Sequence, residues 1–348
     1  MKIVHLIFSL NLGGAEAMLI DIINQQVYRN EVTLCIINKA YNEKLLDNIS
    51  NEVQIILLNR KESSRDIKDL FRLNICIYKI KPDIIHCHDS NIIKYLLFSS
   101  HYCTILTVHD TKLPLKGINK FKHIIAISSS VATMLQNKGM TNISIIYNAV
   151  NAKNINAKQK YQYNSCIRII QVSRLEHLKK GQHLTIKALA LLKRKLPHIQ
   201  VDIDFIGTGS SKNYLEKLAK SLDVSNNIHF LGIRNREYVY SHLKDYDLLV
   251  QPSIYEGFGL TVAEGMIAGL PVLVSDVEGP MEIIQNGQYG YCFQVGNAED
   301  MANKLVEMLQ NPIKVYEIAR IGQVYATSHF DIKELVLKYD ELYKKSLK

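Results

Sequence analysis

The sequence predicts an α/β protein with two doubly wound, Rossmann-like domains that face each other across a cleft. Strand-like apolar runs alternate with helical patterns along almost the whole chain, as in parallel sheets covered by helices on both faces. The alternation lapses once, in a polar stretch without acidic residues at 153–165. The length of 348 residues suffices for two domains of ordinary size.

The first domain is predicted to span residues 1–152. Its opening run, 2–10, superficially suggests a signal peptide, but no clear small-residue cleavage site follows, so a buried first strand is the better interpretation. Apolar runs predict strands at 2–10, 31–37, 53–58, 82–88, 104–108, 123–127 and 143–147. Helical spacing predicts helices at 16–27, 66–79 and 130–137.

Residues 153–165 are predicted to be an interdomain linker, and the second domain is expected at 166–330. Strands are predicted at 167–172, 200–206, 228–231, 247–250 and 272–275. Helices are predicted at 182–196, 212–221, 238–244, 260–268 and 298–309. The segment 331–348 forms a last helix that we expect to pack back on the first domain.

Composition places the chain among soluble, cytoplasmic proteins. The apolar content is 47%, and no apolar run approaches the 18 residues or so of a transmembrane helix. The cysteines are scattered and none forms a C-x-x-C pair, which favours reduced, buried thiols over disulfides or a zinc site. They are Cys35, Cys76, Cys87, Cys103, Cys166 and Cys292.

The net charge of +9 is unevenly distributed, because residues 111–175 contain no Asp or Glu. Such a block attracts nucleotide phosphates, anionic lipid headgroups or nucleic acid, or is simply a solvated surface. Nucleic acid is disfavoured because no aromatic-basic interleaving or known binding motif accompanies the charge. Lys112, Lys116, Lys120 and Lys122 suggest peripheral docking on an anionic membrane, at the inner face of the cytoplasmic membrane.

Glycine turns and polar residues follow several predicted strands, where ligands of doubly wound sheets bind. Gly13 and Gly14 open a helix and can bring backbone N–H groups to a phosphate. His109 follows the strand 104–108, although a lone histidine is often structural. Gly207 and Gly209 form a Gly-x-Gly turn that is permissive for a nucleotide but lacks the third glycine of a dinucleotide fingerprint.

Two further segments of the second domain carry charge at strand ends. Arg174 ends a strand and Lys180 precedes Gly181, a pattern that can clamp a diphosphate; a charged surface loop is the alternative. Glu256 lies in a glycine-rich loop, and Glu264 lies about one turn into the next helix. Because two carboxylates would repel phosphate, sugar or ribose hydroxyls are the expected partners, with two solvated glutamates as the alternative.

Together these motifs resemble the retaining GT-B glycosyltransferases of family four, of the bacterial surface-polysaccharide type, and the resemblance covers nearly the whole chain. The most specific element runs from Pro252-Ser253 through Glu256-Gly257-Phe258-Gly259-Leu260 to Glu264 and on to 268–272. Matching stretches are 13–16, 107–110, 146–151, 174–181, 207–209 and 230–232. Ala149 departs from the pattern, because the family commonly has glycine there.

The resemblance implies a role for each matching residue. Glu256 would contact the donor-sugar hydroxyls, and Glu264 the ribose hydroxyls. Arg174 and Lys180 would hold the diphosphate, which the backbone at Gly13 and Gly14 would also approach. His109 would lie near the donor sugar and the reaction centre. The amides of Phe258, Gly259, Leu260 and Thr261 would contact phosphate and sugar.

The implied reaction is transfer of a hexosyl or N-acetylhexosaminyl unit from a nucleoside diphosphate sugar, in the first place a UDP-sugar, to a hydroxyl of a glycan or lipid-linked glycan. Retention at the anomeric carbon, no cofactor and no metal are expected. Two alternatives remain: a nucleotide-sugar 2-epimerase, and a non-catalytic subunit that binds sugar nucleotides. The polar pattern of Arg174, Lys180, Glu256 and Glu264 favours the transferase.

Two patterns could be mistaken for metal sites. Asp202 and Asp204 form an Asp-x-Asp, a metal-binding signature of another glycosyltransferase fold, but here they lie within a predicted strand. His86 and His88 end a strand, and no second ligand pair follows at a spacing suited to zinc. We therefore assign no metal ligand.

Overall fold

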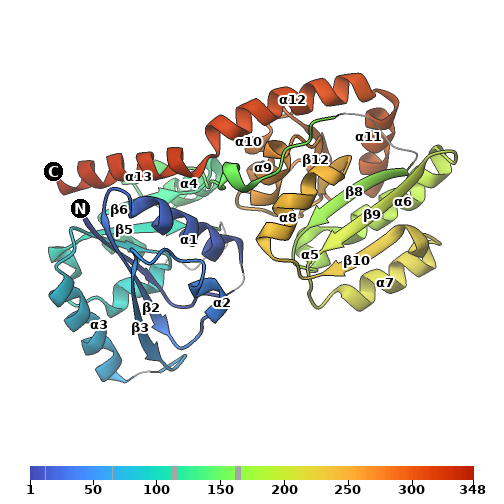
Figure 1. The fold of residues 1–348 in the computed structure, drawn as a ribbon. Helices are drawn as coiled ribbons and strands as arrows, with labels where there is room; N and C mark the ends of the chain where they lie inside the picture. Colours follow the sequence, from blue (N-terminus) through green and yellow to red (C-terminus); the bar gives the residue numbers. More distant parts are fainter. Residues whose placement is uncertain (12, 65, 111–116, 161–165) are drawn as a thin grey trace. The chain divides into compact units, whose positions relative to one another are not determined.

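The computed structural model describes residues 1–11, 13–64, 66–110, 117–160 and 166–348. These residues divide into two compact units. The N-unit comprises Met1–Ala149 together with Ile332–Lys348, and the C-unit comprises Val150–Asp331. The final helix of the chain therefore belongs to the N-unit (Figure 1).

The N-unit is built on a parallel sheet of seven strands in the order β3-β2-β1-β4-β5-β6-β7. The chain crosses over next to β1, so β1 and β4 are neighbours although three helices and two strands separate them in sequence. The strands are β1 (Lys2–Ile7), β2 (Glu31–Asn38), β3 (Gln54–Arg60), β4 (Ile84–Cys87), β5 (Cys103–Val108), β6 (His123–Ala126) and β7 (Ile143–Ile145).

Helices cover the N-unit sheet. They are α1 (Gly14–Gln26), α2 (Glu43–Leu46), α3 (Ile67–Ile80), α4 (Ser129–Asn137) and α13 (Ile332–Leu347), with short 3-10 turns η1 (Ser90–Tyr95), η2 (Ser99–His101) and η3 (Ile118–Lys120). Helix α13 packs beside α1 (Figure 1). Its buried side chains, among them Leu335, Tyr339 and Tyr343, share one core with Met18 of α1 and Ile84 of β4.

The C-unit repeats the design with six parallel strands in the order β10-β9-β8-β11-β12-β13. They are β8 (Cys166–Val172), β9 (Gln200–Ile206), β10 (Ile228–Gly232), β11 (Leu248–Gln251), β12 (Val272–Ser275) and β13 (Tyr291–Phe293). Its helices are α5 (His177–Lys180), α6 (Gln182–Lys195), α7 (Lys212–Ser221), α8 (Arg236–His242), α9 (Leu260–Ile267), α10 (Glu278–Ile283), α11 (Ala298–Gln310) and α12 (Pro312–His329). The 3-10 turns are η4 (Ala152–Asn154), η5 (Ser225–Asn227) and η6 (Leu243–Asp245).

Every predicted strand and helix is present, with ends that differ by at most three residues. The elements that the sequence did not predict are mostly short: α2, α5, α10 and β13. Helix α12 is the exception at 18 residues. Its apolar residues Ile313, Ile321 and Val324 are exposed, so they do not mark a single buried face.

The described part of the predicted linker is bound to the C-unit. Asn156 N–H donates to Tyr240 O at 3.1 Å, and Lys158 N–H donates to Ala268 O at 2.8 Å. The ammonium of Lys158 pairs with Asp247 at 3.2 Å, and both side chains are almost completely buried. Residues 161–165 of the predicted linker lie outside the described residues.

Two predictions from composition concern the cysteines and membrane-spanning helices. The six cysteines are all free thiols, as predicted, and Cys35, Cys87 and Cys103 are buried. Burial raises the pKa of the Cys35 thiol to about 12, so it stays protonated at neutral pH. Among the helices that the structure describes, none combines the length and apolar character needed to span a bilayer.

Candidate functional site

The predicted site residues lie at the carboxyl ends of strands. In the N-unit, Gly13 and Gly14 follow β1, and His109 follows β5 directly. In the C-unit, Arg174 follows β8 and Glu256 follows β11. Each unit therefore carries its own set of candidate groups.

The N-unit has a pocket of about 170 Å³ lined by Phe8, Ala15, Glu16, His88, Asp89 and His109, among others. His109 lines this pocket, and its Nδ1 atom is buried without a hydrogen-bond partner among the described residues. Burial lowers the pKa of His109 to about 4, so its ring is neutral at pH 7. A neutral imidazole can donate or accept a hydrogen bond but supplies no positive charge.

Gly13 is the N-cap residue of α1, and its extended backbone (φ −168°) is open to any residue type. The Cβ of an alanine there would lie 2.3 Å from the Glu16 carboxylate, a flexible group that can move aside. Gly14 begins the helix. The backbone role of both glycines toward a phosphate stays a prediction.

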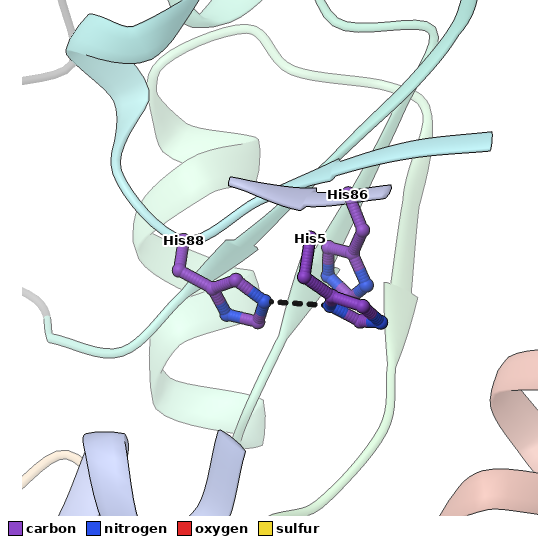
Figure 2. A group of neighbouring side chains, drawn as sticks. All are labelled: His5, His86 and His88. Atoms are coloured by element: carbon purple, nitrogen blue, oxygen red, sulfur yellow. Dashed lines mark hydrogen bonds between the residues drawn. The ribbon is translucent and has the colours of Figure 1, made fainter. Parts of the chain in front are cut away.

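Three histidines converge beside this pocket (Figure 2). His5 on β1 and His86 on β4 are partners in the strand register, and His88 follows β4. His5 Nδ1 lies 3.0 Å from His88 Nε2, the contact dashed in Figure 2. His86 and His88 form a visible sequence pattern, whereas His5 was not predicted to join them. The Rossmann strand order, which places the first and fourth strands side by side, is the signal that could have found it.

Hydrogen bonds occupy most ring nitrogens of this cluster. His5 Nε2 contacts Gln26 Oε1 at 2.7 Å. His86 contacts the Tyr343 hydroxyl at 2.6 Å through Nδ1 and the Thr107 hydroxyl at 2.7 Å through Nε2. A metal ion bound by all three rings would have to displace some of these partners.

In the C-unit, Lys180 and Glu256 form an ion pair whose side chains are only 18% and 15% exposed. The next residue, Gly181, has φ +69° and packs directly against Pro252. The loop is also tied by Ile254 N–H, which donates to Lys179 O at 2.8 Å. Two residues predicted for different parts of a ligand therefore neutralise each other here.

Lys180, Ser253 and Gln251 all contact the same carboxylate oxygen of Glu256. Besides Lys180, Ser253 donates to Oε2 at 3.2 Å and Gln251 donates to it at 3.3 Å. Within the described residues Oε1 has no such partner. The carboxylate is thus fixed through one oxygen, and the other can accept a hydrogen bond from a hydroxyl group.

Glu264 belongs to a chain of contacts that was not predicted from the sequence. Tyr240 of α8 donates its hydroxyl to Glu264 Oε1 at 3.0 Å, and Arg236 Nε donates to the Tyr240 oxygen at 2.6 Å. The Arg236 guanidinium also lies over the Tyr240 ring, 4.9 Å from its centre. The helical i,i+4 spacing of an arginine and a tyrosine was visible, but nothing in the sequence linked it to a glutamate 24 residues later.

The loop before α9 is shaped by close backbone packing. Gly259, the N-cap residue of α9, has φ +104° and provides no side-chain cap, so the first amides of the helix, at Leu260 and Thr261, are open to an anion. Phe258 is buried and meets Phe330 edge-on, so only its backbone can serve a ligand. A Cβ on Gly279 would lie 2.8 Å from Phe258 N.

Gly207 and Gly209 have a packing reason to be glycine. A Cβ on Gly207, whose φ is +135°, would lie 2.1 Å from Ser173 O, and one on Gly209 would lie 2.3 Å from Leu175 O. The turn therefore lets the loop after β9 lie against the loop after β8, near Arg174. Contact of these two glycines with a nucleotide stays a prediction.

Arg174 is exposed, and its backbone carbonyl accepts from Gln182 Nε2 at 2.8 Å. The Asp-x-Asp pair has protein partners instead of an open face. Asp204 accepts from Arg168 at 2.9 Å and from Tyr246 at 2.7 Å, and Asp202 accepts from Asn227 at 2.9 Å. These contacts explain the two aspartates as structural.

Comparison with known proteins identifies the family. The model described as "Glycosyltransferase Family 4" matches residues 12–154, and that described as "Glycosyl transferases group 1" matches residues 153–323. An uncharacterized glycosyltransferase of Methanocaldococcus jannaschii is 28% identical over 64% of this chain and 65% of its own length. The poly(ribitol-phosphate) alpha-N-acetylglucosaminyltransferase of Staphylococcus aureus is 23% identical over 95% of this chain and 62% of its own length. The chain thus spans somewhat less than two thirds of these two relatives.

Solved structures show the same fold. Anabaena HepE, in complex with UDP and glucose, superposes with a TM-score of 0.83 at 22% identity, covering 99% of each chain. Staphylococcus aureus TarM superposes with a TM-score of 0.81 at 15% identity, covering 99% of this chain and 99% of TarM. The two family models together span residues 12–323, and the two Rossmann-like sheets match those of known GT-B proteins. The chain belongs to the family 4 glycosyltransferases of the GT-B fold.

Proposed function

We propose that this glycosyltransferase moves a sugar from a UDP-sugar to a hydroxyl of a glycan or lipid-linked glycan, with retention at the anomeric carbon. The observation that carries the donor part is the C-unit site. This site has two carboxylates and one helix end. Glu256 is anchored through one oxygen and leaves the other open, Glu264 is the second carboxylate, and the N-terminus of α9 has no side-chain cap. Hydroxyl-binding carboxylates beside an anion-binding helix end fit a sugar joined to a diphosphate.

The solved relatives agree with this donor class. HepE was crystallised with UDP-glucose, and TarM with UDP and alpha-GlcNAc-glycerol. The acceptor is proposed from relatives too, since the Staphylococcus aureus enzyme acts on poly(ribitol-phosphate) and WaaB is a lipopolysaccharide outer core galactosyltransferase. Assembly of a bacterial surface polysaccharide is therefore the proposed setting.

The leaving group in this reaction is UDP, and its stabilisation is the main catalytic task. Arg174, which is exposed, would approach the diphosphate, as would the amides of Leu260 and Thr261. Lys180 would bridge Glu256 and the phosphate. We assign no enzymic nucleophile and no metal, because both glutamates are assigned to hydroxyls; the departing phosphate would take the acceptor proton.

The test is a thermal-shift panel of the protein with uridine, guanosine and adenosine diphosphates and their common sugars. A ligand at 100 times its dissociation constant stabilises the fold by about 2.7 kcal/mol. We expect a shift with uridine ligands that is lost in Glu264→Ala and Arg174→Ala. Glu216→Ala, an exposed carboxylate on α7, should keep the shift. Absence of a shift with every nucleotide would refute the donor assignment.

Turnover separates the transferase from a subunit that only binds sugar nucleotides. UDP release from the shifting sugar nucleotide is measured with membrane extracts as the acceptor source, and the product is examined by NMR for the α-anomer that retention from an α-linked donor yields. Binding without UDP release would favour the non-catalytic alternative. Conversion of the donor sugar into its 2-epimer would favour the epimerase.

We also propose that the N-unit docks on anionic membranes. Lys122, Lys345 and Lys348 gather around one pocket with His123, close to the basic block identified in the sequence; Lys112 and Lys116 of that block lie outside the described residues. Clustered lysines attract anionic headgroups, and salt screens the attraction. The test is flotation with phosphatidylglycerol vesicles, where binding at low salt should disappear in Lys122→Glu/Lys345→Glu. Equal flotation with neutral vesicles would contradict an electrostatic mechanism.

A further inference from the structure

The side-chain amide of Gln26 contacts His5 directly and is linked to His86 through the Tyr343 hydroxyl. Gln26 ends α1 and is fully buried. Its Oε1 lies 2.7 Å from His5 Nε2, and its Nε2 lies 3.4 Å from the Tyr343 hydroxyl. An amide oxygen only accepts and an amide nitrogen only donates, so the orientation of this side chain decides which neighbour carries the proton.

The distances favour one orientation. A separation of 2.7 Å suits an N–H···O bond from His5 to Gln26, whereas the reversed amide would place two nitrogens at 2.7 Å, shorter than such bonds normally are. His5 Nε2 therefore carries a hydrogen. Burial lowers the pKa of His5 to about 4, so the ring is neutral and its Nδ1 is bare.

The bare Nδ1 of His5 fixes the state of His88. It can only accept, so the contact of 3.0 Å is a donation from His88 Nε2–H. Burial and the neighbouring His86 hold the pKa of His88 well below its usual range. The neutral His88 then has a bare Nδ1, for which the described residues supply no hydrogen-bond donor, and His88 lines the N-unit pocket.

The contacts on the Gln26 Nε2 side agree with the same amide orientation. Gln26 Nε2 donates to the Tyr343 oxygen, whose own hydrogen goes to His86 Nδ1 at 2.6 Å. His86 Nε2–H then donates to the Thr107 hydroxyl at 2.7 Å. Thr107 lies in β5, two residues before His109, which lines the pocket.

We propose that Gln26, acting through His5, holds His88 in the Nε2–H tautomer, so that Nδ1 of His88 accepts a hydrogen bond from a hydroxyl group of a ligand in the N-unit pocket. Asp89 and Glu16, which also line the pocket, are carboxylates and add to its acceptor character. The pocket volume of about 170 Å³ exceeds that of a single water molecule and accommodates a small polyol or part of a sugar. Identification of the hydroxyl with that of the glycosyl acceptor rests on the proposed function.

The first test is the tautomer of His88 in the free protein at pH 7.5. Two-bond ¹H–¹⁵N correlation spectra of protein labelled at histidine distinguish a protonated ring nitrogen from a bare one. We expect a protonated Nε2 and a bare Nδ1 for His88 and for His5. The reverse tautomer of His88, or a charged ring, would overturn the proposal, and neither result depends on nucleotide binding.

Two variants test the relay itself. In Gln26→Leu, His5 loses its acceptor, and His88 should populate both tautomers. In Tyr343→Phe, the contact of Gln26 Oε1 with His5 remains, so the His86 signals should change while His88 keeps its tautomer. A His88 tautomer unaffected in a folded Gln26→Leu would refute the relay. If that variant does not fold, the unaltered protein and Tyr343→Phe still decide.

The ligand class is tested by titration with glycerol, a minimal polyol that fits the pocket. The His88 Nδ1 signal should shift, whereas that of His183, which lies in the C-unit on α6, should not. A His88 signal that stays constant up to molar glycerol would overturn the hydroxyl assignment. A thermal shift with UDP that persists in the variants would show that this failure leaves the proposed donor binding intact.

Discussion

Replacing Gly181 by alanine should damage the C-unit far more than replacing a glycine of similar backbone conformation elsewhere. Gly181 has φ +69°, a region that costs an alanine about 1 kcal/mol. Its Cβ would also lie 1.8 Å from Pro252 O, a backbone atom, so the loop that holds Glu256 must move by more than an ångström. The hydrogen bond from Ile254 N–H to Lys179 O and the Lys180–Glu256 pair should then be weakened.

The control for this prediction is Gly296→Ala. Gly296 has φ +78°, but a Cβ there meets nothing within 4 Å, so only the backbone cost of about 1 kcal/mol remains. Adding a lost hydrogen bond and a disturbed ion pair brings Gly181→Ala to about 3 kcal/mol. For a unit of this size the Tm should fall by about 6–12 °C for Gly181→Ala and about 2–4 °C for Gly296→Ala.

Differential scanning calorimetry measures both variants, and the UDP-induced shift is recorded beside it. Gly181→Ala should also lose most of that shift, because Lys180 and Glu256 leave their positions. Equal Tm losses in the two variants would refute the reasoning, since the contact with Pro252 is the feature that distinguishes them.

Two further predictions concern groups that the sequence analysis missed. Tyr240→Phe removes the hydroxyl that donates to Glu264, and calorimetric titration should show a Kd for UDP about fivefold higher, corresponding to ~1 kcal/mol. The control is Tyr238→Phe on the same helix. Equal effects of the two substitutions on the Kd would contradict a role for the Tyr240–Glu264 contact. Acidification should destabilise the N-unit, because burial lowers the pKa of His5 to about 4 in the folded protein from about 6.5 in the unfolded chain. The contribution of this group to the free energy of unfolding is complete above pH 6.5. It falls by up to about 1.4 kcal/mol per pH unit as the pH drops toward 4. Urea unfolding followed at pH 7.5, 6.0 and 5.0 measures the slope, and a stability independent of pH in this window would count against a neutral, buried cluster.

The fold was predictable because its signal repeats. In a parallel sheet buried on both faces, each strand must be apolar along its length and each crossover helix must have one apolar side. Strands such as Ile84–Cys87 and helices such as Lys212–Ser221 can therefore be predicted from their own local sequence. Helix α12 does not, since it exposes Ile321 and Val324, and its Gly322 is required by the backbone of Tyr289 close by.

The sequence predicted the carboxylates of the candidate C-unit site but not the residues that contact them. Glu256 and Glu264 lie in one short segment whose glycines mark an unusual loop. The groups that contact them come from elsewhere: Lys180 from α5, and Tyr240 from α8. Such contacts depend on how the elements pack, and a hydroxyl that donates to a carboxylate leaves no pattern in the sequence.

The histidine cluster shows which kind of site a linear motif cannot contain. His86 and His88 alone form an ordinary strand end, and they gain a partner only because the strand order sets β4 against β1, with His5 opposite His86. Helix α13 then closes the cluster with Tyr343, 257 residues from His86 in the sequence. Every polar atom in this network restricts its neighbour, so a single buried amide can determine what the pocket offers to a ligand. Strand β1, through His5, and helix α13, through Tyr343, together hold this buried network in one arrangement.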